Sequence, residues 1–373
     1  MEFNLISDSG VAEPFKAESR ETLDMMVVQH FENFESFVEN SSQTLPTFDD
    51  NNILALKDNT LHIAKTLFKS DTTTVYKAES STDGEIAAKV QSPAVVWAYY
   101  IYVQLLGRLG QDSHLAASDR FLEFYSMHHY RQATVAILQY LPHGSLHNML
   151  NKMKQDRVTM EEPLKMFLAI ELLRTVETMH QADIIHSNIS PSNMFVTFGG
   201  DDDAAPDQTE WTPDNTNWRR IGLKLGSFSL SIDLQLYGNQ VRYTASRDDL
   251  PADCGTALPA VLASRGPYWS HDIDYLGVAQ TLYFIVSDGN QLDEGDLTQD
   301  SEGQWHLDAS KLRASLQTSM WVSAIDQLLN QAEQSSALLC KIRDNFGAQL
   351  ASNPTKLKSF YRQIRKLKID FAS

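Results

Sequence analysis

Residues 184–193 read Ile184-Ile185-His186-Ser187-Asn188-Ile189-Ser190-Pro191-Ser192-Asn193. Two isoleucines lead into a polar loop that opens with His186 and closes with Asn193. The preceding segment, 163–181, carries apolar residues at helical spacing, so we expect a long helix to run into this loop. A single histidine in such a setting is more often a hydrogen-bonded core residue than a catalyst, and this is how we interpret His186.

Four further landmarks lie around this loop, two on each side. Upstream, an expected strand ends near Lys89 and a helix is expected just after it. A second expected strand, 134–138, leads into a glycine-serine turn that opens the next helix. Downstream, a short expected strand leads to Ser227, and Asp274 lies at the start of another long expected helix. The four segments read Ala87-Ala88-Lys89-Val90, Gln139-Tyr140-Leu141-Pro142-His143-Gly144-Ser145-Leu146, Gly226-Ser227-Phe228-Ser229 and Asp274-Tyr275-Leu276-Gly277.

Expected strands fill the first third of the chain and expected helices fill most of the remainder. Short alternating runs separated by polar turns predict strands, and 3.6-residue periodicity predicts the helices. The segregation of the two types predicts an α+β fold with two lobes. The strands are expected at 61–67, 74–78 and 84–90, and the main helices at 95–109, 146–154, 163–181 and 273–287.

These patterns divide the chain into three parts. We expect an N-terminal extension at 1–50, a strand-rich lobe at 51–141 and a helical lobe at 142–373. The extension contains an apolar stripe at i, i+3 and i+4 spacing, which predicts one amphipathic helix over 20–39. Because such a stripe needs burial, we expect the helix to pack on the following domain; a helix that binds a partner is the alternative.

Taken together, the five segments resemble a protein kinase. Residues 186–193 resemble the catalytic loop His-Arg-Asp-x-x-x-x-Asn, and residues 226–229 stand where kinases carry Asp-Phe-Gly. Lys89 stands at the place of the kinase lysine, and Asp274 resembles the aspartate that opens the large helix of the C-lobe. Each segment alone is a weak signal, but five in order over roughly residues 60–290 form a strong one.

Two segments narrow the resemblance to the Bub family of mitotic spindle-checkpoint kinases. The segment from Lys89 to Leu105 is similar to the segment that, in this family, runs from the kinase lysine into the following helix. The residues that follow the Asp-Phe-Gly position are also similar to those of this family, and here they read Leu230-Ser231-Ile232-Asp233-Leu234. Ile189-Ser190-Pro191 and Ser229 look more like the Bub-related pseudokinase branch. The resemblance implies checkpoint and kinetochore proteins as partners, and localisation to cytoplasm or nucleus and to kinetochores in mitosis. It also implies that the chain is a C-terminal fragment of a longer protein.

The nucleotide-binding parts of a kinase are altered in this sequence. The turn at 67–75, where kinases carry a glycine-rich loop, contains no glycine, and Asp71 places a negative charge where phosphates would lie. Lys89 is present, but the helix glutamate that normally holds it corresponds to Ala98. Lys89 and Asn193 are therefore at most vestigial nucleotide-binding residues, and we expect no cofactor and no metal.

The catalytic residues are altered as well. The position of the catalytic aspartate is Asn188, whose amide cannot act as a base near neutral pH. Two residues after Asn188, Ser190 stands where kinases usually carry a lysine. At the Asp-Phe-Gly position, Ser227 replaces the magnesium-binding aspartate and Ser229 replaces the glycine. Loss of a general base costs ~10²–10⁴-fold and loss of a major electrostatic stabiliser ~10²–10³-fold. What survives is the pair His186 and Asp274, which by resemblance ties the catalytic loop to the core of the C-lobe.

These residues predict a catalytically inactive pseudokinase that acts as a structural and interaction module, a scaffold in a checkpoint protein. Two alternatives remain open. One is a divergent Ser/Thr kinase that recruits acids from elsewhere, such as Asp233 or the acidic insertion at 201–214. The other is a nucleotide-sensing pseudokinase that binds ATP through Lys89 without hydrolysis, against which the glycine-free turn argues.

Composition excludes several other classes. The chain has 373 residues and a net charge of −17, and such acidity disfavours binding to nucleic acid. Two cysteines, Cys254 and Cys340, are too few for a disulfide scaffold or a four-cysteine zinc site. No stretch approaches the ~20 apolar residues that span a bilayer, and no secretory signal is visible, so we expect a soluble intracellular protein without membrane contact.

Overall fold

The computed structural model describes most of the chain in two compact units. The sheet unit comprises Lys16–Gln111 and Leu122–Leu141, and the helical unit comprises Met1–Phe15, Asp112–Phe121 and Pro142–Ser373. We describe each unit by itself. The described residues are 11–12, 17–31, 36–49, 51–109, 114–198, 221–237, 242–243, 258–264, 270–331, 335–352 and 354–371.

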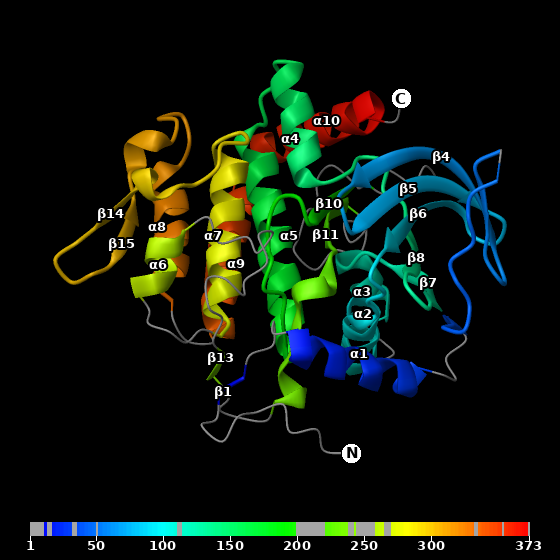
Figure 1. The fold of residues 1–373 in the computed structure, drawn as a ribbon. Helices are drawn as coiled ribbons and strands as arrows, with labels where there is room; N and C mark the ends of the chain where they lie inside the picture. The colour runs from blue at the N-terminus through cyan, green and yellow to red at the C-terminus, as the bar shows by residue number, and fades with distance from the viewer. Residues whose placement is uncertain are drawn as a thin grey trace. The chain divides into compact units, whose positions relative to one another are not determined.

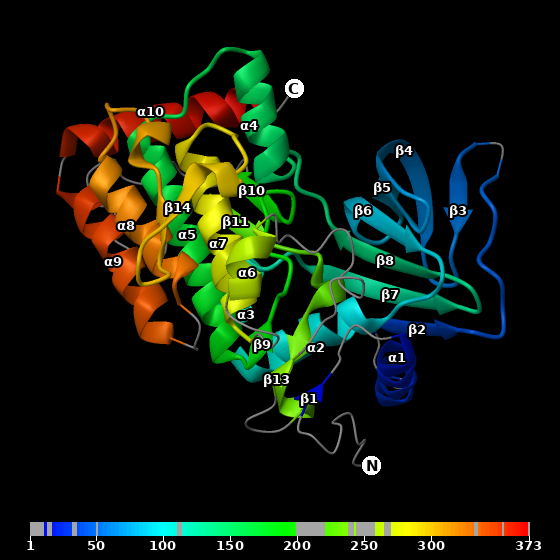
Figure 2. The same cartoon turned by 60° about the vertical axis from the view of Figure 1, so that its left-hand side comes forward.

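A seven-stranded sheet with the order β2-β7-β8-β6-β5-β4-β3 forms the frame of the sheet unit (Figure 2). All neighbouring strands run antiparallel except β2 and β7, which are parallel. One face buries a cluster that includes Leu61, Ile86 and Val135. The strands are β2 Phe37–Asn40, β3 Ile53–Ala55, β4 Thr60–Lys69, β5 Thr73–Ser80, β6 Gly84–Gln91, β7 Phe124–Tyr130 and β8 Thr134–Gln139.

The N-terminal segment differs from the single helix predicted over 20–39. Helix α1 spans Ala17–Phe31, and residues 37–40 form strand β2 instead. Strand β2 pairs with β7, and His129 Nδ1 hydrogen-bonds to the carboxylate of Glu39 at 2.9 Å. The prediction was wrong here because pairing with a distant strand overrides local helical spacing. Both elements belong to the sheet unit, so they do not form a separate extension.

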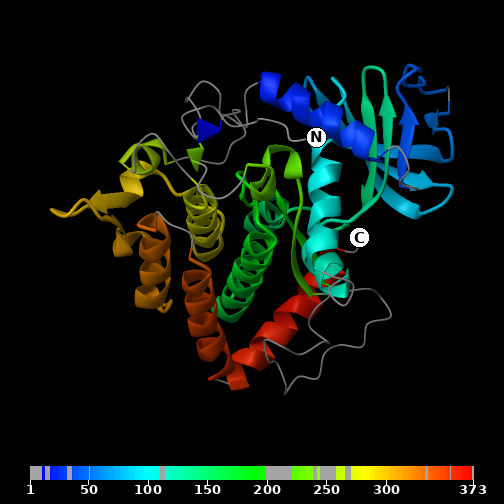
Figure 3. The same ribbon diagram turned by 90° about the horizontal axis from the view of Figure 1, so that it is seen from below.

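Helix α1 packs on the sheet unit through helix α2, Trp97–Leu109, as predicted (Figure 3). Leu23, Val27 and Phe31 are buried, and the Phe31 ring lies 5.2 Å from that of Tyr99 in a T-shaped contact. The backbone N–H of Val96, just before α2, donates to Asp24 Oδ1 at 3.3 Å. The apolar stripe therefore serves packing within this unit.

Helix α5, Glu162–Gln181, runs through the middle of the helical unit and packs against α7, α9 and α10 (Figure 1). Every side chain of α7, Asp272–Val286, is buried. The four main helices predicted begin and end within two residues of those observed, because their apolar periodicity is clear. The other helices are α3 His114–Arg120, α4 Leu146–Gln155, α6 Pro259–Ser264, α8 Thr318–Leu329, α9 Ser336–Ala351 and α10 Pro354–Phe371.

Short two-stranded pairs complete the helical unit. Two of these pairs, β9 with β12 and β10 with β11, lie on either side of the loop at 186–193 in the sequence. The short strand expected just before Ser227 is β11, whereas the other short strands were not predicted, since two to five residues carry too little periodicity. The pairs are β9 Ile184–Ile185 with β12 Ile232–Asp233, β10 Met194–Phe198 with β11 Ile221–Leu225, β14 Leu297–Gln299 with β15 Trp305–Leu307, and β1 Val11–Ala12 with β13 Arg242–Tyr243. Among the described helices, none combines the length and apolarity required to cross a membrane.

Candidate functional site

His186 lies fully buried between β9 and β10 in the helical unit. Its Nδ1 accepts the backbone N–H of Asn188 at 3.2 Å, and its Nε2 lies 3.0 Å from the carbonyl oxygen of Gly226. Since a carbonyl only accepts and an amide N–H only donates, the ring is neutral with its hydrogen on Nε2. Burial lowers the pKa of His186, which favours the same state. The imidazole thus joins the loop to the end of β11.

Asp274, at the start of α7, holds the other side of this loop. Its Oδ1 accepts the backbone N–H of Ser187, and its Oδ2 accepts that of His186, both at 2.8 Å. His180 Nε2 lies 2.9 Å from the same Oδ2. Burial raises the pKa of Asp274, but the contacts with His180 and His186 outweigh this effect and the net pKa is lowered. Ser187 has φ +63°, a left-handed conformation that the two hydrogen bonds stabilise.

Gly277 brings α7 against the same loop one turn later. A Cβ atom at this position would lie 2.5 Å from the carbonyl oxygen of Ile189 and 2.8 Å from its Cβ. Both distances are far below van der Waals contact, so only glycine fits at this close approach. Asp274 and Gly277 together fix the path of the loop on α7.

The positions that carry reagents in a kinase meet in this loop. Asn193 Nδ2 donates to the carbonyl oxygen of Asn188 at 2.9 Å, and the carbonyl oxygen of Asn193 accepts the N–H of Gly226 at 3.0 Å. Asn188 is buried, whereas Ser190 is partly buried. Ser227 follows Gly226 directly, is exposed and has φ +68°. The side chain of Asn193 is therefore engaged in holding the loop itself.

In the sheet unit, Lys89 lies on β6 between Val75 of β5 and Ala136 of β8. Its side chain is partly buried, and burial lowers its pKa to about 8. Helix α2 carries no aspartate or glutamate at any of its positions, and Ala98 is buried. A carboxylate from this helix thus cannot hold Lys89, whichever residue is aligned with the kinase glutamate.

The turn between β4 and β5 is closed by its own hydrogen bonds. Ser70 N–H donates to the carbonyl oxygen of Thr73 at 2.8 Å, and Thr73 N–H donates to Ser70 Oγ at 3.1 Å. The carbonyl oxygen of Thr72 accepts Ser92 N–H at 2.9 Å. Two backbone amides that a glycine-rich loop would offer to phosphates are engaged here, and Asp71 is exposed at the tip.

Comparison with known proteins finds checkpoint kinases of the Bub family both by sequence and by structure. No family model matches the chain. It is 25% identical over 307 residues to the mitotic checkpoint kinase BUB1 of Arabidopsis thaliana, covering 80% of this chain and 55% of that protein. It is 30% identical over 199 residues to BUB1 of Mus musculus, covering 53% and 17%. The crystal structure of the BubR1 kinase domain superimposes with a TM-score of 0.77 at 19% identity, covering 95% of this chain and 99% of that one.

The chain resembles the Bub family of checkpoint kinases over most of its length, and its fold is kinase-like. The predicted resemblance and the predicted α+β kinase-like fold are confirmed. The chain matches about half of the length of the Arabidopsis relative and about a sixth of the mouse one.

The chemistry available to this kinase-like domain follows from the loop geometry. Mg²⁺ prefers charged oxygen ligands, but Asn188, Asn193 and Ser227 supply only neutral groups. Asp233, considered above as a substitute acid, is completely buried in β12, and its Oδ1 accepts the N–H of Gln235 at 3.0 Å. The acidic insertion at 201–214 lies outside the described residues. Among the residues that the structure does describe, no cluster of three or more metal-ligating side chains occurs.

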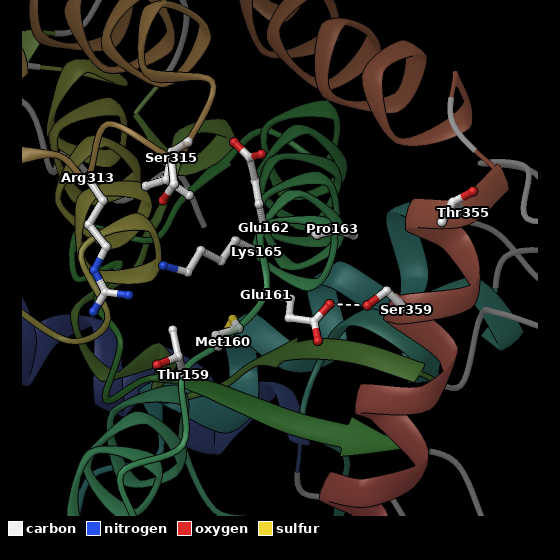
Figure 4. A pocket seen from close by; sticks show the side chains of 11 residues that line it. Thr159, Met160, Glu161, Glu162, Pro163, Lys165, Arg313, Ser315, Thr355 and Ser359 are labelled. Carbon is white, nitrogen blue, oxygen red and sulfur yellow. Dashed lines mark hydrogen bonds between the residues drawn. The ribbon is translucent and has the colours of Figure 1, made fainter.

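The kinase-like domain also contains a pocket that sequence patterns did not indicate. It has a volume of about 420 Å³ and lies where the start of α5, residues 313–316 and α10 meet (Figure 4). None of the kinase-motif positions lines it. Its walls come from three segments far apart in sequence, so no local pattern could have revealed it.

Proposed function

We propose that this Bub-family domain is a catalytically inactive pseudokinase that acts as a folded interaction module of a spindle-checkpoint protein. Its proposed partners are mitotic-checkpoint and kinetochore proteins, and its proposed place is the kinetochore in mitosis, because the relatives are named as mitotic checkpoint and spindle assembly checkpoint kinases. We propose no role in nucleic-acid or membrane binding.

One contrast carries the proposal. The contacts that hold the catalytic loop are present, through His186, Asp274 and Gly277. The acids that a kinase needs are replaced at Asn188 and Ser227, and α2 supplies no carboxylate for Lys89. Phosphoryl transfer depends on positioned charge. A combined loss of ~10⁵ would reduce a turnover of ~1–100 s⁻¹ to less than about one event per quarter hour.

An active, divergent Ser/Thr kinase is the second candidate, because the relatives carry serine/threonine-protein kinase in their names. The burial of Asp233 argues against its recruitment as a catalytic acid. A nucleotide sensor that binds ATP through Lys89 is disfavoured by the self-closed turn at Ser70–Thr73.

A phosphate-transfer assay with Mg²⁺ or Mn²⁺ tests the proposal. We expect the wild-type chain and its Lys89→Met variant to give the same background phosphate incorporation, which contaminating kinases would produce equally. A wild-type signal that disappears in Lys89→Met would establish catalysis and overturn the proposal.

Thermal melting with millimolar ATP and metal tests the nucleotide sensor separately. A ligand at 100 times its Kd stabilises the folded state by ~2.7 kcal/mol, roughly 2 °C or more for a domain of this size. We expect no such rise. A rise in the wild type that is absent in Lys89→Met would instead support nucleotide sensing.

A further inference from the structure

The hairpin β14–β15 lies at the periphery of the helical unit, beside α8 (Figure 1). Its two strands pair antiparallel, with Gln299 opposite Trp305 at the end next to the turn. Residues 300–304 form the turn and are exposed, and the backbone N–H of Asp300 donates to the carbonyl oxygen of Gln304 at 3.0 Å. The hairpin therefore presents an exposed turn on a short stem that borders α8.

His306 lies in β15 with both of its ring nitrogens next to carboxylates. Nδ1 is 3.0 Å from Asp326 Oδ2 of α8, and Nε2 is 3.1 Å from Asp300 Oδ2 of the turn. A neutral imidazole has one N–H and one lone pair, so it can donate to only one of these two carboxylates. The imidazolium ion has two N–H groups and can donate to both, so this geometry requires the protonated ring.

Backbone groups hold the two carboxylates in place on either side of the ring. Asp326 Oδ1 accepts the backbone N–H of Leu307 at 2.8 Å. Asp300 Oδ1 accepts two backbone N–H groups of its own turn, at 2.8 and 2.9 Å. Because these hydrogen bonds fix each carboxylate, neither can rotate away from His306 without losing a contact to the backbone. The ring thus connects the turn to α8.

The other elements around the ring bring no titratable side chain to it. Asp326 is the only titratable residue of α8, and β14 has none. Helix α6, whose Ser264 hydroxyl accepts the indole N–H of Trp305 at 3.1 Å, has none either. Lys311, which follows β15, pairs with Asp296 at 2.8 Å. The charged groups that face His306 are therefore Asp300 from the turn and Asp326 from α8.

The pKa of His306 agrees with this geometry. The hydrogen bonds to Asp326 and Asp300 raise it above the usual histidine value of 6.5. A group whose folded-state pKa is raised adds stability that is complete below its unfolded pKa and is lost as pH rises through its folded pKa. The contribution of His306 is therefore complete below 6.5 and is lost on the alkaline side of that value.

We propose that the protonated His306 side chain is a pH-dependent link between the turn at 300–304 and α8. When the ring releases its proton to solvent, a lone pair faces one of the two carboxylates and that contact becomes repulsive. The contact with Asp300 should open first, because this carboxylate is 39% exposed whereas that of Asp326 is 20% exposed. The turn then loses its link to α8, while β15 stays bound to α8 through other contacts. This inference requires neither catalysis nor its absence, so its test is independent of the proposed function.

Nuclear magnetic resonance of the whole chain with isotope-labelled histidine tests the charge state. The imidazole signal that disappears in His306→Gln identifies the residue. We expect its titration midpoint to lie above 6.5, and Asp300→Asn and Asp326→Asn each to lower it. A midpoint at or below 6.5, or one that either substitution leaves unchanged, overturns the proposal.

Hydrogen exchange measured by mass spectrometry tests the release of the turn. Protection is expressed relative to the intrinsic exchange rate at each pH, so that only structural opening is compared. Between about pH 6 and about pH 8.5, we expect the protection of residues 296–308 to fall at least about threefold in the wild type and to stay constant in His306→Gln, which carries no titratable proton.

His62→Gln is the matched control, because His62 is an exposed histidine on β4 in the sheet unit. This variant should keep the wild-type fall in protection. Constant protection in the wild type, or an equal fall in His306→Gln, would show that His306 does not link the turn to α8.

Discussion

At the scale of single residues, the loop at 186–193 keeps the residues that hold its backbone in place but lacks the charged residues that a kinase uses for catalysis. His186 and Asp274 hydrogen-bond to backbone groups of the loop and of Gly226, which directly follows β11. Gly277, which has no side chain, lets the backbone of the loop approach α7 closely. Asn188 and Ser227 supply only neutral groups, and so neither a base near neutral pH nor a charged ligand for Mg²⁺. Residues that hold a loop and residues that react can therefore change independently.

Gly277→Ala should destabilise the helical unit. The added Cβ would lie 2.5 Å from a backbone oxygen, which cannot rotate away as a flexible side chain would. We expect a loss of ~1–3 kcal/mol in the free energy of unfolding, measured by urea denaturation. Gly107→Ala in α2 is the matched control, because nothing lies within 4 Å of its Cβ and alanine favours a helix by up to ~1 kcal/mol. Equal effects of the two changes would contradict the close approach at Gly277.

Asp274→Ala should also be strongly destabilising. It leaves the N–H groups of His186 and Ser187 buried without their acceptor, at a cost of ~1–3 kcal/mol each. Because the folded-state pKa of Asp274 is lowered, its contribution is complete above the usual aspartate value of 3.8 and is lost as pH falls through the lowered folded pKa. The difference between wild type and variant in urea melts should therefore be constant near neutral pH and shrink only in strong acid. The exposed Asp156→Ala is the control and should cost less than about 0.5 kcal/mol.

At the scale of elements, the N-terminal segment shows how a helix and an added strand extend the sheet unit. Helix α1 covers α2, and β2 adds a parallel edge strand beside β7. Phe31 and Phe37 both contact the ring of Tyr99, at 5.2 and 5.9 Å, and Ser36 Oγ hydrogen-bonds to Tyr99 Oη at 2.5 Å. Tyr99 therefore connects the helix, the strand and α2.

Phe31→Ala should test this packing. Phe31 is completely buried, and large-to-small changes of a core phenylalanine cost ~3–5 kcal/mol. We expect a corresponding loss of stability in thermal or urea melts. Met25→Ala on the same helix is the control, since Met25 is 63% exposed. Identical melting of Phe31→Ala and wild type would mean that α1 is not docked in solution. Phe34, which lies within the helix predicted over 20–39, is outside the described residues.

At the scale of the whole molecule, a module that works by being folded should respond to stability rather than to catalytic residues. Lys89 illustrates this point. The Lys89 side chain is partly buried, and burial lowers its pKa to about 8. Since folding disfavours its charged form, Lys89→Met, which keeps the length and removes the charge, should not lower stability at neutral pH.

In cells, Lys89→Met and Asp274→Ala should therefore separate the proposals. We expect Lys89→Met to keep normal protein abundance and checkpoint function, and Asp274→Ala to reduce both, because ~1–2 kcal/mol of lost stability can change abundance several-fold. Immunoblotting and a mitotic-arrest assay measure the two quantities. Normal abundance with lost function in Lys89→Met would argue for an enzyme or a nucleotide sensor.

The amino-acid sequence by itself determined the kinase-like fold and the chemical groups at its motif positions. Long periodic helices such as 163–181 follow from local pattern, and Asn188 lacks a carboxylate in any conformation. Tertiary structure alone decided that residues 37–40 form a strand, that burial lowers the pKa of Lys89 to about 8, and that Lys165 and Arg313 share the carboxylate of Asp288. Strand pairing and desolvation depend on which distant segments come together, and no local pattern carries that information.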